Sequence, residues 1–268
     1  MMANGGSPDY KKYAKAFDAL KLSQFVCARC GFETHSASTN SFCNFCEQYA
    51  SAAAATRPAF LDVHAYIKQG NWEDAAKKVE ELLKTDKNTE TFYLSGLFYA
   101  YFSNLRYRKV DYGAKGFMDT NAENIRAGLD LVSKSKEHLF GAISLVAAEP
   151  KKGVQPDQDA LFIKFMSEMK LRRFVDASKT IKTLQGAQAE YAEMAYGAQT
   201  GSKSTPGLEK LLARNEVNAF YYLAEHLARQ KELGEAAALL RKLNDRINLF
   251  MAQELLNRVV SVQEASKP

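Results

Sequence analysis

Residues 65–86 read AYIKQGNWEDAAKKVEELLKTD, which is the pattern of two helices joined by a tight turn. The first helix is expected to end near Gln69, and Gly70 with Asn71 turns the chain. In the second helix the apolar residues recur at helical spacing on one face, at Ala75, Val79, Leu82 and Leu83. The small side chain of Ala75 permits a close helix crossing, and Trp72 is placed to wedge between the two helices. This stretch therefore predicts a helical hairpin.

The same pattern recurs along the chain at a nearly constant interval. Residues 165–184 and 222–243 repeat it, with small residues at the corresponding positions, Ala177, Ala224 and Ala236. Weaker copies lie in the intervening stretches, residues 91–148 and 191–214. The expected starting points, near residues 57, 90, 157, 188 and 217, give the ~34-residue period of a helical repeat protein, apart from one longer unit. Residues 249–262 provide a final amphipathic helix, which a solenoid needs to close its last open face.

This hairpin resembles the tetratricopeptide repeat, in which a glycine is followed two residues later by an aromatic residue and then by an alanine. Gly70, Trp72 and Ala75 match that pattern, whereas Lys87 stands where the family usually has a proline. The resemblance implies a mainly α fold over residues 57–268. It further implies a right-handed solenoid of about five helical hairpins with a capping helix.

All four cysteines of the chain lie in one short segment, as two C-x2-C pairs separated by twelve residues: Cys27, Cys30, Cys43 and Cys46. Each pair curls the chain so that two thiolates point to one place, and four thiolates at tetrahedral angles suit Zn²⁺. Because four thiolates leave no open coordination position, we predict one structural zinc ion. The spacer is long enough for a β-hairpin, and Gly31 allows the tight turn of the first pair. His35 is interpreted as a bystander, since four cysteines suffice.

Three other roles for these cysteines were weighed against zinc. Iron, as a rubredoxin-like mononuclear site or a cluster, uses the same ligands and is separated from zinc by elemental analysis. Two disulfides are disfavoured in a chain without a secretion signal. A redox-active C-x-x-C would need a thioredoxin-like βαβ context, which the sequence lacks. Zinc is the favoured prediction.

The segment from Phe25 to Cys46 resembles the short zinc-ribbon family, in which a CxxCG motif, a polar hairpin and a second CxxC preceded by an aromatic residue follow in order. Glu47 departs from the family, since glycine is common after the last cysteine. The resemblance implies a small β zinc ribbon, which in this family often serves as a docking module. The predicted apolar shell of the site is Phe25, Phe32, Phe42 and Phe45. The predicted division of the chain is residues 1–50, a short helix over 10–22 plus the zinc ribbon, and residues 57–268, the helical repeats.

Composition and charge place the chain among ordinary globular proteins. Of its 268 residues 46% are hydrophobic and 25% are charged, and the net charge is +5. A charge this mild permits an acidic partner without demanding one. No apolar run approaches the ~20 residues of a membrane span, and the first residues lack the apolar core of a signal peptide. We therefore expect a cytoplasmic protein without a membrane partner.

No catalytic motif occurs in the sequence. The four histidines lie in no metal-binding spacing, and neither a phosphate-binding loop nor a nucleophile elbow is present. The cysteines are all assigned to the metal. We therefore expect no enzymatic activity and no small-molecule substrate.

Two hypotheses for the function remain. In the first, the chain is a noncatalytic adaptor whose repeat groove binds a protein or peptide partner, while the ribbon docks a second one. Position by position, the tetratricopeptide resemblance assigns these residues to the groove: Tyr221, Glu225 and Arg229 of a late repeat, and Tyr93 and Tyr101 of an early one.

The alternative hypothesis is an RNA-binding factor, within a ribosome or another ribonucleoprotein. Residues 106–117 interleave basic and aromatic side chains in a glycine-containing loop, which suits phosphate contact and base stacking. Its basic residues Arg106, Arg108 and Lys109 would form one RNA-binding surface with the ribbon and the basic N-terminal helix. The mild net charge favours the adaptor hypothesis.

Overall fold

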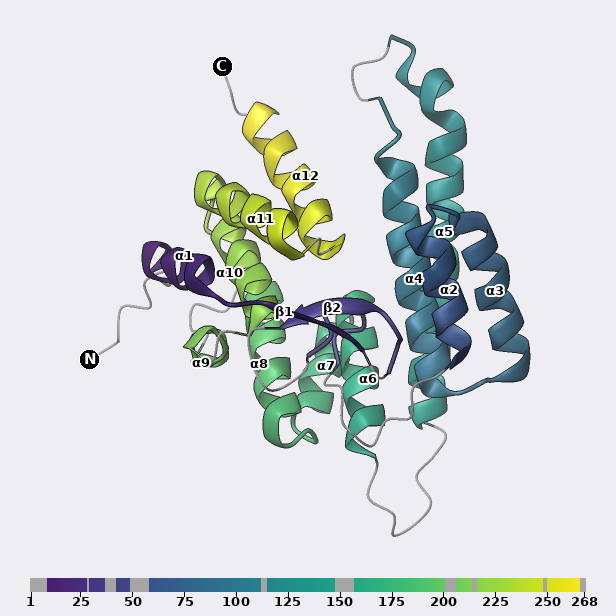
Figure 1. Cartoon of the computed structure of the whole chain (residues 1–268), viewed down its shortest axis with the longest axis horizontal. Helices are drawn as coiled ribbons and strands as arrows, with labels where there is room; N and C mark the ends of the chain where they lie inside the picture. The colour runs from purple at the N-terminus through teal and green to yellow at the C-terminus, as the bar shows by residue number, and fades with distance from the viewer. Residues whose placement is uncertain are drawn as a thin grey trace. The chain divides into compact units, whose positions relative to one another are not determined.

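The computed structural model of the chain is mainly α-helical. It describes residues 9–27, 29–36, 42–48, 58–111, 115–147, 157–200, 206–213, 216–247 and 250–265. Within these ranges it contains twelve α-helices and one two-stranded antiparallel sheet (Figure 1). The predicted mainly α class with a small β element is confirmed.

The chain forms two compact units, which are described separately below. Unit 1 comprises Met1–Thr56 together with Leu184–Pro268, and unit 2 comprises Arg57–Thr183. This grouping by packing joins segments that lie far apart in the sequence. The division into residues 1–50 and 57–268 concerns sequence modules, and it stays a prediction.

Unit 2 consists of three consecutive helix pairs. They are α2 (Pro58–Lys68) with α3 (Trp72–Thr85), α4 (Thr89–Tyr107) with α5 (Phe117–Ala147), and α6 (Gln158–Lys170) with α7 (Phe174–Ile181). The members of each pair contact one another, and α4 also contacts α3 and α6. Three helices begin at a side-chain cap, since Asn71, Asn88 and Asp157 each accept a hydrogen bond from a backbone N–H of the first turn.

Unit 1 combines the N-terminal elements with the last helices of the chain. The N-terminal elements are α1 (Tyr10–Ala19), β1 (Ser23–Val26) and β2 (Glu33–Ser36). The helices are α8 (Gly186–Thr200), α9 (Pro206–Ala213), α10 (Val217–Arg229), α11 (Leu233–Ile247) and α12 (Phe250–Ala265). Helix α10 contacts α1, α8, α9, α11 and α12, so it is the central helix of this unit.

The helix pairs begin close to the predicted positions. The expected starts near 57, 90, 157, 188 and 217 compare with observed starts at 58, 89, 158, 186 and 217. The final helix, expected over 249–262, is α12. The first helix was predicted too long, because it ends at Ala19 and residues 23–26 form a strand instead. Five consecutive pairs and a final helix are thus present, while a right-handed solenoid stays a prediction.

The small residues expected at the helix crossings are fully buried. Ala75, Ala177, Ala224 and Ala236 are all 0% exposed. Gly70 has a φ of 74°, which is the left-handed conformation that the turn between α2 and α3 needs. Trp72 stacks on Phe98 and Phe102 of α4, with ring centroids 5.8 Å and 5.7 Å apart. It therefore joins the first helix pair to the second.

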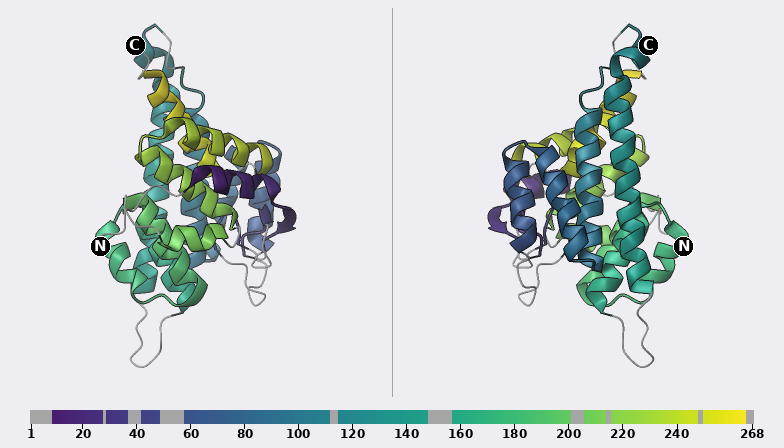
Figure 2. Two further views of the ribbon diagram at one scale, coloured as in Figure 1. Left: turned by 90° about the vertical axis from the view of Figure 1, so that its left-hand side faces the viewer. Right: turned by 90° about the vertical axis from the view of Figure 1, so that its right-hand side faces the viewer.

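Glycines bring α4 and α5 close together along their length (Figure 2). A Cβ atom at Gly96 of α4 would lie 2.7 Å from Cγ of Leu139, and one at Gly141 of α5 would lie 2.6 Å from Cδ1 of Phe92. Both distances are shorter than a van der Waals contact. The absence of these side chains therefore sets the spacing between the two helices.

None of the helices within the described ranges is both long and apolar enough to cross a membrane. This result agrees with the hydropathy of the sequence.

We predict that Gly96→Ala lowers the free energy of unfolding of unit 2 by about 1–3 kcal/mol, because its new methyl group forces Leu139 and the backbone of α5 away. The matched control is Gly234→Ala in α11, where a Cβ atom would meet nothing within 4 Å. That variant should leave stability unchanged or raise it by up to about 1 kcal/mol. Urea denaturation of both variants and the parent checks this, and equal stability of all three would contradict it.

Candidate metal centre

The two C-x2-C pairs form two knuckles of the same backbone shape. In the first, the N–H of Cys27 donates to the carbonyl of Phe32 at 2.9 Å, and Gly31 N–H donates to the carbonyl of Cys27 at 2.8 Å. In the second, Cys43 N–H donates to the carbonyl of Gln48, and Glu47 N–H donates to that of Cys43, both at 2.9 Å. This repetition presents each pair of sulfurs in the same way.

The β-hairpin encloses the first knuckle, and of its two strands only β2 lies in the spacer that was expected to form the whole hairpin. Strand β1 precedes Cys27, and it pairs with β2 in a register from Ser23 opposite Ser36 to Val26 opposite Glu33. Spacer residues 37–41 lie outside the described residues. The hairpin thus holds the first knuckle at its tip.

The four sulfur atoms form one buried cluster. Each cysteine is 0% exposed, and the four Sγ atoms all lie within 4.8 Å of one another. The Sγ atoms of Cys27 and Cys46 are 3.9 Å apart, and those of Cys30 and Cys43 are 3.6 Å apart. A tetrahedral ion with sulfur at ~2.3 Å places its ligands ~3.8 Å apart, so these residues fit one metal ion. All four cysteines are free thiols, so no disulfide joins them.

The thiols can share this small space as thiolates only around a cation. Hydrogen bonds from the neighbouring thiols, above all from Cys30, lower the pKa of Cys27. Burial raises the pKa of Cys30 and of Cys46. A bound cation is what stabilises several buried thiolates at once.

Polar contacts around the cluster tie the two knuckles together. Arg29 Nη1 donates to Gln48 Oε1 at 3.0 Å, and both residues are buried. Asn44 contacts β2 twice, through its N–H to Thr34 Oγ1 at 2.9 Å and through Nδ2 to the carbonyl of His35 at 2.8 Å. The backbone N–H of Cys46 donates to Cys43 Sγ at 3.5 Å. Such bonds orient the ligands before the metal arrives.

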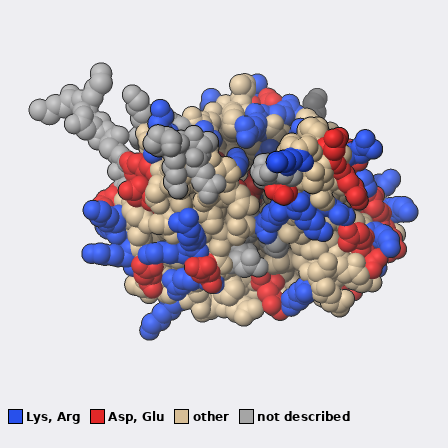
Figure 3. Space-filling model, turned by 90° about the horizontal axis from the view of Figure 1, so that it is seen from above, with Lys and Arg blue, Asp and Glu red and all other residues tan. Residues whose placement is uncertain are grey.

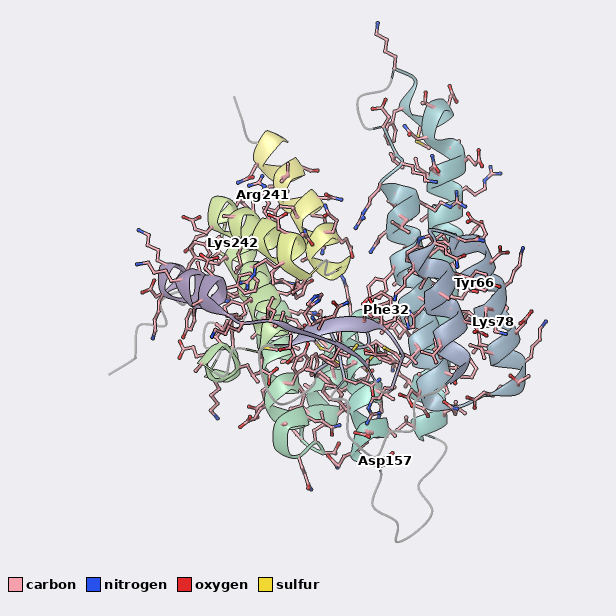
Figure 4. All side chains as sticks on the ribbon, in the orientation of Figure 1. Phe32, Tyr66, Lys78, Asp157, Arg241 and Lys242 are labelled. Atoms are coloured by element: carbon pink, nitrogen blue, oxygen red, sulfur yellow. The ribbon has the colours of Figure 1, made fainter. Side chains whose placement is uncertain are left out.

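Aromatic side chains pack around the centre, as the sequence predicted for part of the shell. Phe32, which is labelled in Figure 4, stacks on Phe45 with ring centroids 4.3 Å apart. Phe42 is 3% exposed and stacks on Tyr191 of α8 at 4.4 Å. Phe25 is only half-buried. The second knuckle is therefore packed directly against a helix that lies some 150 residues later in the chain.

Glu47 links the centre to the central helix of unit 1. It has a φ of 52°, close to the 74° of Gly31 at the same place in the first knuckle, so a non-glycine residue takes a left-handed conformation here. Its side chain is fully buried, and Oε1 accepts a hydrogen bond from the Tyr222 hydroxyl of α10 at 3.4 Å. This contact joins the second knuckle to α10. Sequence patterns did not indicate Tyr191 or Tyr222, since neither lies near a cysteine in the chain.

The N-terminal helix packs on the same unit. Phe17 of α1 meets Phe220 of α10 with ring centroids 5.0 Å apart. Lys242 of α11 forms an ion pair with Asp18 of α1 at a nitrogen–oxygen distance of 2.6 Å. Arg246 donates to the backbone carbonyls of Phe17 and Leu20. The elements on the N-terminal side of the metal centre are thus also held by α10 and α11.

A groove lies on the other side of α10, between this helix, the start of α11 and α12. Its volume is about 270 Å³, and its lining residues are Glu225, Ala228, Arg229, Leu233, Leu255, Arg258, Val259 and Val262. We call it the α10–α12 groove. Two of the predicted partner-binding residues, Glu225 and Arg229, line it. The groove residues from α12 were not among the predicted partner-binding residues.

The predicted tyrosines lie in the interior. Tyr221 is 5% exposed and packs edge-to-face against Tyr222 at 5.2 Å. Tyr93 is 0% exposed and Tyr101 is 5% exposed in α4 of unit 2. These side chains belong to the two cores and offer no surface to a partner.

The predicted basic residues are only partly available. Arg106 forms an ion pair with Glu73 at 2.6 Å and lies over the ring of Phe102 at 5.4 Å. Arg108 and Lys109 are exposed in the turn that follows α4. Residues 112–114 of the predicted loop lie outside the described residues.

No protein-family model, curated protein or solved structure matches this chain.

We predict that Cys43→Ser abolishes metal binding, because hydroxyl oxygen is a poor replacement for the fourth thiolate. Elemental analysis of the purified parent should give close to one zinc per chain, and the variant close to none. The control is His35→Gln, which should retain the metal because His35 is not a ligand. Iron in the parent, or loss of metal from the control, would contradict the assignment.

We further predict that removing the metal loosens α8 and α10, because Phe42 and Glu47 connect the centre to both helices. Hydrogen–deuterium exchange after treatment with a chelator should show faster exchange over residues 186–200 and 217–229. Residues 89–107 of unit 2 serve as an internal control and should not change. Faster exchange confined to residues 23–48 would contradict this coupling.

Proposed function

We propose that this chain is a noncatalytic, cytoplasmic adaptor in which a zinc-stabilised helical repeat binds a segment of a protein partner in the α10–α12 groove. One observation carries the proposal. Glu225 and Arg229, which the repeat resemblance assigns to a ligand groove, line that groove together with residues of α12.

The arrangement of the helices supports a repeat-type groove. Helix α10 is the first helix of the last pair, and α12 occupies the corresponding place after it. In a tetratricopeptide-like solenoid the first helices of successive repeats line the ligand groove. The right-handed solenoid is part of this proposal.

The size and chemistry of the groove suit a peptide. A volume of about 270 Å³ is at the low end for small-molecule sites, and it accommodates one or two side chains. Its floor is apolar, with Leu255 and Val259 6% and 3% exposed. Arg229 and Arg258 stand at its rim with 43% and 53% of their side chains exposed, and each forms an ion pair within its own helix, with Glu225 at 3.6 Å and with Glu254 at 3.9 Å. Such arginines are frequent anchors in protein interfaces, and these two favour a segment with apolar and acidic residues.

The zinc centre has a structural role in this proposal. Its cysteines, together with Phe42, Glu47 and Gln48, are buried against α8 and α10 or within the knuckles. This burial favours an internal brace over the separate docking module that the ribbon resemblance implied. A tetrathiolate site also requires a reducing compartment, which supports the cytoplasmic location.

RNA binding is less well supported by the same residues. Arg106 is already paired with Glu73, and on the face shown in Figure 3 acidic side chains are interspersed among the basic ones. A nucleic-acid surface usually gathers basic side chains into a patch. RNA binding is therefore treated as an outcome of the test.

The test is selection of random twelve-residue peptides on the full-length, metal-loaded protein, followed by fluorescence anisotropy of the selected peptides. Arg229→Glu should weaken binding at least tenfold, because it reverses an anchor charge. Lys210→Glu, an equal charge change on exposed α9, should leave affinity within twofold of the parent.

The same titration with a labelled single-stranded RNA of mixed sequence distinguishes the alternative. RNA affinity that falls steeply between 50 and 200 mM salt, without selection of any peptide, would overturn the adaptor proposal. Selected peptides whose binding is weakened equally by Arg229→Glu and by Lys210→Glu would also overturn the proposal.

A further inference from the structure

The N-terminal part of α5 carries an apolar stripe on a projecting helix end. Met118 is 64% exposed and Leu129 is 56% exposed, which are high values for large apolar side chains. Ala122 is exposed and Ile125 is half-buried on the same side of the helix. Within unit 2, this end of α5 extends past α2 and α3 (Figures 1 and 2).

The stripe is distinct from the face that α5 buries inside unit 2. The buried residues Asn121, Gly128 and Ser135 follow one another at intervals of seven. Asn121 bonds to the backbone of Asp111, Tyr107 packs over Gly128, and Ser135 Oγ donates to the carbonyl of Gly96 at 2.7 Å. The stripe lies roughly 80° around the helix from this face, at 100° per residue.

The spacing of the stripe is that of a coiled-coil seam. Met118, Ala122, Ile125 and Leu129 are separated by four, three and four residues. This alternation keeps one line of side chains facing a partner helix. We expect an apolar line of this kind to pack against another helix.

We propose that this stripe pairs with the same stripe of a second copy of the chain, with the two α5 helices antiparallel. In that arrangement Met118 faces Leu129 of the second copy, and Ala122 faces its Ile125. The two residue numbers of each layer add up to 247. The four layers, 118 with 129, 122 with 125, 125 with 122 and 129 with 118, therefore form in a single register. The small Ala122 is always opposite the larger Ile125, which fills the seam evenly.

The flanking charges specify this orientation. Asp119 and Arg126 border the stripe on one side, and within the described ranges neither has an ion-pair partner. Antiparallel pairing brings Asp119 of each copy next to Arg126 of the other, which gives two attractive pairs. In a parallel pair each residue would lie level with the same residue of the other copy, so Asp119 would be level with Asp119 and Arg126 with Arg126. Charge complementarity therefore identifies a second copy, in antiparallel orientation, as the occupant.

Four layers make a small interface. It buries much less than the ~1,600 Å² of a standard interface, so we expect a reversible dimer with a dissociation constant of roughly 10–1,000 µM. This association is independent of the α10–α12 groove, which lies in unit 1.

Sedimentation velocity of the full, metal-loaded chain from about 5 to 500 µM tests the pairing. Leu129→Glu should abolish dimerisation, and Met118→Glu should do the same, which guards against a folding defect in one variant. The matched control Val175→Glu, at a residue of α7 that is 71% exposed, should leave dimerisation unchanged.

Charge exchange tests the orientation. Asp119→Arg and Arg126→Asp alone should each weaken the dimer about five- to thirtyfold, since each turns two attractive pairs into repulsive ones. The double variant should return to within about twofold of the parent. A parent that stays monomeric over the whole range, a dimer abolished only by Val175→Glu, or a double variant that is not restored would overturn the proposal.

Discussion

The structure of unit 1 depends on four sulfur atoms within 4.8 Å of one another in a space closed to water. Burial raises the pKa of Cys30 and Cys46, and a metal ion in the centre would stabilise their thiolates. The segment from Phe25 to Gln48 is too small to be held by apolar burial alone. We therefore expect metal binding to supply part of the free energy that holds this segment in place.

That stabilisation does not stop at the knuckles. Phe42 on Tyr191 and Glu47 on Tyr222 connect residues about 150 and 175 positions apart, and the entropic cost of closing such long loops rises only slowly with their length. Tyr222 lies on α10, and Glu225 and Arg229 of the α10–α12 groove follow it on the same side of that helix, three and seven residues later. One helix thus connects the metal centre with the proposed binding surface, so that metal loading supports the geometry of the groove.

The sequence was sufficient for features whose signals are local. Gly70 and the apolar residues around Ala75 define a turn and a helix within about twenty residues, which explains why the helix pairs begin within about two residues of their predicted positions. The spacing of the cysteines likewise predicted the four residues that the structure brings within metal-binding distance. The partners of the ribbon on α8 and α10 were not predictable, because no local pattern states which distant aromatic residue Phe42 will meet. A related reason explains why three tyrosines predicted for the binding groove are buried in the core instead, Tyr93, Tyr101 and Tyr221. On a helix that is covered on several sides, core residues and groove residues recur at the same spacing.

Exposure separates the two kinds of apolar residue that periodicity cannot distinguish. Met118 and Leu129 belong to an apolar pattern with helical periodicity, as the core residue Leu139 does. They nevertheless remain more than half exposed. The residues of this stripe and those of the α10–α12 groove do not overlap, so self-association through α5 uses none of the groove residues. A dimer would then present two grooves in one assembly. A partner with two copies of the bound segment would gain avidity without any new contact, because its second binding step becomes intramolecular. Weak dimerisation and modest peptide affinity, each insufficient alone, are together consistent with a reversible scaffold.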